Sequence, residues 1–111
     1  MKNKDLERSV EGAQKIVKVL NDRTRLKILF FLSKQERNVS ELQSLVQRSH
    51  TATSHHLSKL KSNRMVSAER KGKYMYYSLK DEHIKTILKV MFEHTMEEGE
   101  FCGTPSQKRL L

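Results

Sequence analysis

Residues 39–79 constrain the fold more than any other part of the chain, because two helical patterns and two β-prone runs follow one another almost without linkers. "VSELQSLV" places apolar residues at helical spacing. The polar "QRSH" interrupts that pattern for about one turn, and "TATSHHLSKLKSN" resumes it with Leu57 and Leu60 as inward positions. A short helix, a tight turn and a second helix form the helix-turn-helix arrangement.

The first of these two helices carries polar residues that could close its N-terminal end. Ser40 and Gln43 have the spacing of a capping box, in which each side chain bonds the backbone N–H of the other residue. We interpret them as that box. Three apolar residues of the same helix are expected to face the core: Leu42, Leu45 and Val46.

A β-hairpin is expected directly after the second helix. "MVSAER" and "YMYYSL" are β-prone runs on either side of "KGK", and Gly72 can supply the positive φ that a hairpin turn often needs. A hairpin with a basic tip in this position is the wing of a winged helix. The expected fold class is therefore mostly α with a β-hairpin wing.

Further helical patterns flank this region. The first has apolar residues at alternating steps of four and three: Leu6, Val10, Ala13, Val17 and Leu20. Asp5 is its expected start. "NDRTRLKILFFLS" predicts a more buried helix capped by Asn21 or Asp22, and Asp81 is the expected N-cap of a last helix that ends near Glu98. We expect one domain over residues 1–98 and a flexible tail over residues 99–111.

Charge and composition limit the partners. The 111 residues suffice for one domain, and 22 Lys and Arg against 13 Asp and Glu give a net charge of +9. Nucleic acid is the first candidate partner and an acidic membrane surface the second. No run of about 18 apolar residues could span a bilayer, and the N-terminus lacks the apolar stretch of a signal peptide, so we expect a cytoplasmic protein. A single cysteine, Cys102, fits a reducing compartment.

Double-stranded DNA is the expected partner of the helix-turn-helix, and position assigns roles to its side chains. The N-terminal half of the second helix enters the major groove, with His50 as either a turn residue or a base reader. We interpret the adjacent His56 as polar surface. The residues expected near base edges are Thr51, Ser54, His55 and Ser58. The residues expected at phosphates or along the wing are Ser49, Lys59, Lys61, Arg70, Lys71 and Lys73.

Four stretches together carry a resemblance to a known family: "LNDRTRLKILFFL", "VSELQ", "TSHHLSKLKSNRMVSAERKGKYMYYSL" and the helix from Asp81. Over roughly residues 5–98 the chain resembles the ArsR (SmtB/ArsR) family of metal-sensing repressors. The resemblance implies a homodimeric winged helix whose terminal helices form the interface. Arg23 stands where that family usually has proline. The Cys-x-Cys of its arsenic and cadmium sensors is absent from "NVSELQ", so that thiolate site cannot exist here.

Four possible metal ligands lie along the last helix: Asp81, His83, His94 and Glu97. Eleven residues from His83 to His94 rise roughly 16 Å, so one ion cannot bind both histidines of a single chain. On a helical wheel, however, His94 falls only about 20° from His83, and Glu97 about 40° away on the other side. Two such helices, packed antiparallel about a twofold axis, would form two identical sites for Zn(II), or for Co(II) as a surrogate. This spacing resembles the zinc-sensing subset of the family.

Simpler interpretations remain beside the metal site. Asp81 alone would be a helix cap, and Glu97 alone a solvated charge. The sequence predicts a repressor that binds a palindromic operator as a homodimer and is released by Zn(II). The alternative keeps the fold and answers to a non-metal signal, or to none. A zinc hydrolase is disfavoured, because four protein ligands leave no open position for water.

Overall fold

The computed structural model describes the backbone of residues 2–99 and the side chains of residues 2–96. It divides into two compact units, one up to Lys80 and one from Asp81. The first unit contains α1 (Asn3–Leu20), α2 (Arg23–Lys34), β1 (Arg37–Asn38), α3 (Val39–Val46), α4 (His50–Ser62), β2 (Val66–Lys71) and β3 (Tyr74–Leu79). The second contains α5 (Glu82–Gly99). Apart from Gly99, the expected tail lies outside the described residues. No described helix is long and apolar enough to cross a membrane.

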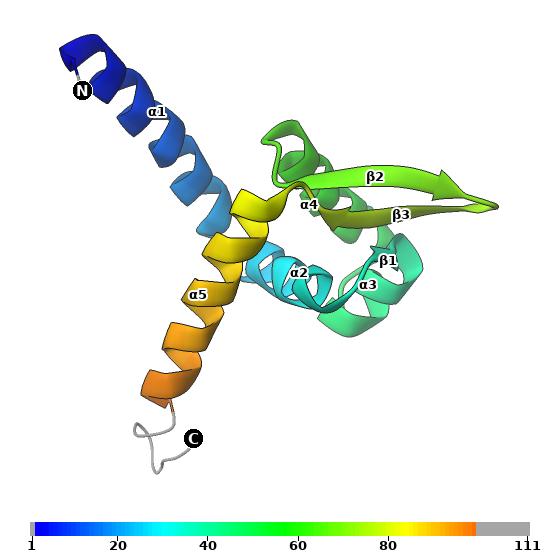
Figure 1. Ribbon diagram of the computed structural model, residues 1–111. Helices are drawn as coiled ribbons and strands as arrows, with labels where there is room; N and C mark the ends of the chain where they lie inside the picture. Colours follow the sequence, from blue (N-terminus) through cyan, green and yellow to red (C-terminus); the bar gives the residue numbers. More distant parts are fainter. Residues whose placement is uncertain (1, 100–111) are drawn as a thin grey trace. The chain divides into compact units, whose positions relative to one another are not determined.

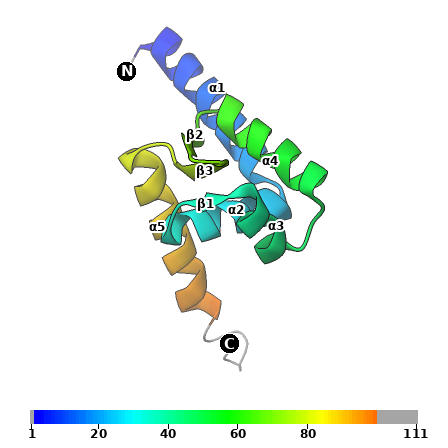
Figure 2. The same ribbon diagram turned by 90° about the vertical axis from the view of Figure 1, so that its right-hand side faces the viewer.

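The predicted winged helix-turn-helix is confirmed in the first unit. Figure 2 shows α3 and α4 joined by a short turn, and Figure 1 shows the β2–β3 hairpin extending beyond the helices of that unit. The strands form one antiparallel sheet in the order β1-β3-β2. Gly72 at the hairpin turn has a φ of +65°, as expected from "KGK". The two-residue strand β1 lies directly before α3, where the sequence analysis expected no strand.

Side-chain caps set the starts of several helices. Asp22, one of the two predicted caps, caps α2, where its side chain accepts a hydrogen bond from the backbone N–H of Arg25 at 2.9 Å. In α3 the predicted capping box is wrong. Asn38 and Glu41 form it, with both hydrogen bonds at 2.9 Å. Asn38 pairs with Tyr76 in the sheet, which fixes it in the extended conformation of an N-cap and places Ser40 inside the helix.

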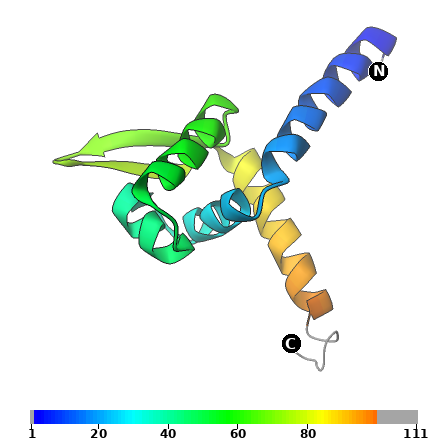
Figure 3. The ribbon, with the colours of Figure 1, turned by 180° about the vertical axis from the view of Figure 1, so that it is seen from behind.

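The first helix begins earlier than predicted. It starts at Asn3 after Lys2, which makes no side-chain cap, so Asp5 lies inside the first turn and not at its start. A carboxylate in that turn still interacts favourably with the helix dipole. Figure 3 shows α1 extending away from α2 and α4 over most of its length. Accordingly, its apolar residues Leu6, Val10 and Val17 are exposed, and only Val19 near its end is buried.

The core of the first unit lies between α2, α3, α4 and the sheet. Its most deeply buried residues are Ile28, Leu29, Leu42, Leu57, Leu60, Met65 and Val66. The prediction that Leu45 faces this core is wrong. Leu45 is 39% exposed, because it lies at the edge of the apolar arc of a helix only eight residues long. Thr53 is fully buried, and its hydroxyl donates a 2.8 Å hydrogen bond to the carbonyl of Ser49, which removes the cost of burying it.

Candidate nucleic-acid interface and metal ligands

A short turn and a side-chain cap fix how α4 begins. Gln47 adopts a left-handed conformation with a φ of 56° and closes α3 through a hydrogen bond to the carbonyl of Gln43. Ser49 then caps α4, and its hydroxyl accepts a hydrogen bond from the backbone N–H of Ala52 at 3.0 Å. Ser49, expected at a phosphate, thus also has a structural role. In the first turn of α4, His50 and Thr51 are exposed, whereas Thr53 is buried.

The predicted base-facing residues form one face of α4. At about 100° per residue, Thr51, His55 and Ser58 fall within about 60° of one another around the helix. All three are exposed, as is His50, while Ser54 is half-buried. Lys59 and Lys61 lie about 80° to either side of Thr51, so they border this face on both edges. In a major groove, these edges would turn toward the phosphates of the two strands.

The wing carries three exposed cations, and one of them is already engaged. Lys71 donates to both carboxylate oxygens of Glu36, at 2.7 and 2.9 Å. These hydrogen bonds raise the pKa of Lys71 above its usual value. Arg70 and Lys73 have no such carboxylate partner among the described residues. A phosphate would therefore have to compete with Glu36 for Lys71, but not for the other two.

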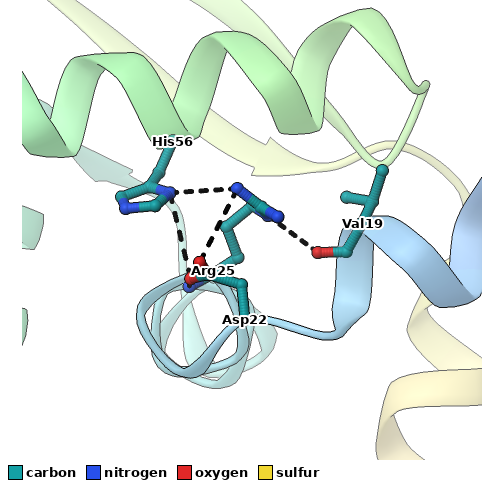
Figure 4. A network of polar contacts seen from close by, with 4 residues as sticks. All are labelled: Val19, Asp22, Arg25 and His56. Atoms are coloured by element: carbon teal, nitrogen blue, oxygen red, sulfur yellow. Dashed lines mark hydrogen bonds and ion pairs between the residues drawn. The ribbon is translucent and has the colours of Figure 1, made fainter.

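A polar network on the inner side of α4 was not predicted. Figure 4 shows His56 with residues near the α1–α2 junction. Arg25 donates from Nε to the carbonyl of Val19 at 2.7 Å, and its Nη1 lies 3.2 Å from Nδ1 of His56. Asp22 lies 3.9 Å from both Arg25 and His56. The sequence had suggested that His56 is polar surface, and this interpretation is wrong. Its side chain is only 13% exposed and contacts Arg25 of α2, which lies 31 residues earlier in the sequence.

Burial and hydrogen bonding shift two pKa values in this network. Burial lowers the pKa of His56 most. The carboxylate of Asp22 raises this pKa to a smaller extent, and Arg25, Arg48 and His55 lower it further. A hydrogen bond from the backbone N–H of Arg25 lowers the pKa of Asp22. A neutral His56 can accept from Arg25, whereas a protonated one cannot. Both shifts thus favour the protonation states that maintain the network at neutral pH.

The predicted metal ligands lie toward the two ends of α5. Asp81 caps α5, with its Oδ1 accepting from the backbone N–H of Ile84 at 3.1 Å. A carboxylate has further lone pairs, so this bond does not prevent metal binding. His83 and His94 are exposed on one uninterrupted helix, and Glu97 lies on that helix with its side chain outside the described part. Within the described residues no three His, Cys, Asp or Glu side chains form a metal-binding group.

Comparisons with known proteins agree with this geometry. Residues 22–68 match the family described as "Bacterial regulatory protein, arsR family". A cadmium resistance transcriptional regulatory protein CadC homolog from Staphylococcus aureus is 38% identical over 75% of this chain and 69% of its own length. A transcriptional repressor SmtB homolog from Synechocystis is 34% identical over 80% of this chain and 70% of its own length.

A solved structure shares the fold as well. The transcriptional regulator HlyU from Vibrio vulnificus superposes with a TM-score of 0.74 at 33% identity, over 85% of this chain and 98% of that one. These relatives are transcriptional regulators and not enzymes. The chain therefore belongs to the ArsR family of bacterial regulatory proteins, as a transcriptional regulator with a DNA-binding winged helix.

Proposed function

We propose that this protein is a homodimeric repressor that binds a palindromic operator in the cytoplasm and releases it on binding Zn(II), with residues 1–98 as its working domain. The observation that carries the DNA part is the exposed face of α4, bordered on both edges by Lys59 and Lys61. Thr51, His55 and Ser58 would read bases from this face, with Ser54 and His50 beside them. Arg70 and Lys73 on the wing would contact the backbone.

Exposed apolar side chains support the dimer. Leu6, Val10 and Val17 on α1 are 48–63% exposed, and Ile87 and Val90 on α5 are 48% and 59% exposed. Helical stripes of this kind are usually covered in a stable protein. Association of two chains through their terminal helices would cover them. A twofold dimer also presents two α4 helices to DNA, which is the reason for expecting a palindromic site.

The chemistry of the donors supports Zn(II) as the effector. Asp81 and His83 would hold the metal together with His94 and Glu97 of a second chain, and these nitrogen and oxygen donors suit Zn(II) and Co(II). The bound metal would tie the two α5 helices together. "NVSELQ" offers no thiolate for a site of another type. The alternative is a regulator of this fold without a metal, favoured by the role of Asp81 as a helix cap, which gives this carboxylate a structural function of its own.

The test combines metal binding with DNA binding. The metal-free protein first selects its preferred duplex from a random pool, and fluorescence anisotropy then measures affinity for that duplex with chelator or with saturating Zn(II). Allosteric couplings of about 1–3 kcal/mol predict a weakening of roughly 5- to 150-fold. Co(II) titration should give a tetrahedral spectrum at one metal per chain.

Two variants sharpen this test. His94→Ala should retain the DNA affinity of the metal-free protein and lose the zinc response. Lys89→Ala, an exposed change on the same helix, should retain both. Equal DNA affinities of the wild-type protein with and without Zn(II) would end the derepression proposal, and tight Co(II) binding by His94→Ala would exclude the ligand set.

A further inference from the structure

A basic hollow of about 220 Å³ lies where α1 ends, α2 begins and α4 ends. It is lined by Lys15, Lys18 and Val19 of α1, Arg25 of α2, and Lys59 and Asn63 at the end of α4. Four of these six residues are cationic and none is a carboxylate, although the carboxylate of Asp22 lies 3.9 Å from Nη1 of Arg25. Of the residues that line this hollow, only Lys59 has a role in the proposed DNA or metal sites.

The arginine in this hollow is fixed before any ligand arrives. The Nε of Arg25 is held by the carbonyl of Val19 at 2.7 Å and its Nη1 by His56 at 3.2 Å, and its side chain is only 14% exposed. A guanidinium held in this way loses little conformational entropy when it binds an oxyanion. It is also permanently charged, so its contribution does not depend on pH.

The three lysines are not neutralised by the protein. Through their ammonium groups, Lys15, Lys18 and Lys59 form no ion pair or hydrogen bond within residues 2–96. Glu11 lies one turn before Lys15 on α1, yet no ion pair joins them. The dipoles of α1 and α4 favour Lys18 and Lys59 individually, because each lies in a last turn. They do not account for three lysines and an arginine around one hollow, where like charges repel each other.

We propose that this hollow is a binding site for a phosphate group. Concave surfaces lined by one sign of charge concentrate the field and attract oppositely charged ligands. Lysine and arginine together are the usual protein partners of phosphate oxygens, and the side-chain amide of Asn63 adds a neutral polar group at the rim. The chemistry thus specifies a phosphate group, and it has two sources: a free phosphorylated small molecule, or the DNA backbone.

The position of Lys59 makes the second source compatible with the DNA proposal. Lys59 borders the reading face of α4 and also lines the hollow. A backbone phosphate outside the base-read segment could therefore reach the hollow while α4 lies in the major groove. This half of the proposal rests on the proposed function, whereas binding of a free phosphate compound does not.

The first experiment uses the full chain labelled with ¹⁵N and titrated with sodium pyrophosphate against sodium chloride of equal ionic strength. Binding in the hollow should move the resonances of the Arg25 Nε–H, the Asn63 side-chain amide and the Val19 amide in a saturable way. Lys15→Gln/Lys18→Gln should weaken this binding at least tenfold. Lys2→Gln/Lys4→Gln removes the same charge at the N-terminal end of α1 and should leave pyrophosphate binding unchanged. Lys18→Gln alone replaces the double variant if that one unfolds.

The second experiment measures the salt dependence of binding to a random-sequence 30-base-pair duplex. If the hollow takes one backbone phosphate, Lys15→Gln/Lys18→Gln should reduce the slope of log K against log salt by about one per chain, beyond any change in the Lys2→Gln/Lys4→Gln control. Localised pyrophosphate binding supports the free ligand, and a selective loss of slope supports the DNA source. If neither differs from the control, the proposal is overturned. Wild-type protein that fails to bind DNA at all would refute the repressor instead, and the pyrophosphate result would still decide this site.

Discussion

The reading helix α4 and the terminal helix α5 differ in how much of their proposed function one chain can assemble. On α4 the candidate residues share one exposed face, and Ser49, Thr53 and the buried Leu57 and Leu60 fix the orientation of that face. On α5 the candidate ligands are divided between the two ends of one helix. One chain therefore suffices to form a reading surface, whereas metal sensing would require a second. Metal sensing would then depend on dimerisation.

The largest expected effect tests whether the reading surface depends on its own core. Leu57 is fully buried, so Leu57→Ala should lower the free energy of unfolding by about 2–5 kcal/mol. Ile87→Ala on α5, where the side chain is 48% exposed, should cost much less in dilute protein. Urea denaturation at several protein concentrations measures both. If the loss for Ile87→Ala equals that for Leu57→Ala at every concentration, the contrast between the two regions is wrong.

The second prediction tests whether the ligands of α5 are shared between chains. Asp81→Ala/His83→Ala and His94→Ala/Glu97→Ala each remove one half of every proposed site, so neither homodimer should bind Co(II) tightly. Mixed heterodimers should hold one intact site and one empty one, that is, one metal per dimer. Co(II) spectra of the parents and of the refolded mixture measure this stoichiometry. Tight binding by either parent alone would mean that the ligands do not come from two chains.

The same contrast explains what could be predicted from the sequence. Periodicity and local turn chemistry predicted the helices, the turn at Gly72 and the cap at Asp22, because each depends on neighbours along the chain. The capping box of α3 could not be assigned in this way, since Ser40–Gln43 and Asn38–Glu41 both have suitable spacing. Pairing of Asn38 with Tyr76 in the sheet decides between them.

Long-range contacts account for the differences at His56 and at the basic hollow. The Arg25–His56 hydrogen bond joins residues 31 positions apart, so adjacent histidines on a polar helix gave no sign that one points inward. The basic hollow likewise draws its residues from three helices. Among the candidate site residues, the α4 face follows from helical spacing alone. Whether the α5 ligands meet depends on a second chain, which neither the sequence nor one protomer contains.

The third prediction concerns the pH dependence of the inner side of α4. Because the pKa of His56 is lowered in the folded protein, the unfolded chain binds more protons over the interval below about 6.5. Its stabilising contribution is complete above that pH and is lost as pH falls through the folded pKa. His56→Gln can still accept from Arg25 but does not titrate. It should preserve stability at pH 7.5 within about 1 kcal/mol and flatten the decline between pH 7 and 5.

Chemical denaturation at half-unit pH steps measures this effect. Asp22, whose lowered pKa acts in the same direction, should contribute only below about pH 4. The His55→Gln variant is the matched control, since His55 is exposed on the same helix. If His55→Gln flattens the curve as much as His56→Gln does, the inward histidine is not the source of the pH dependence.

The smallest expected effect separates the two wing lysines. Lys71 is bound to Glu36 and Lys73 is not, so Lys73→Ala should reduce the slope of log K against log salt by about one per chain, and Lys71→Ala by less. Glu36→Gln should free Lys71 for phosphate and strengthen DNA binding by no more than about fivefold, because an exposed ion pair contributes little. Glu7→Gln changes the net charge equally at an exposed site of α1 and should give a smaller gain. Equal gains from Glu36→Gln and Glu7→Gln would show that overall charge, and not release of Lys71, controls the affinity of the wing for DNA.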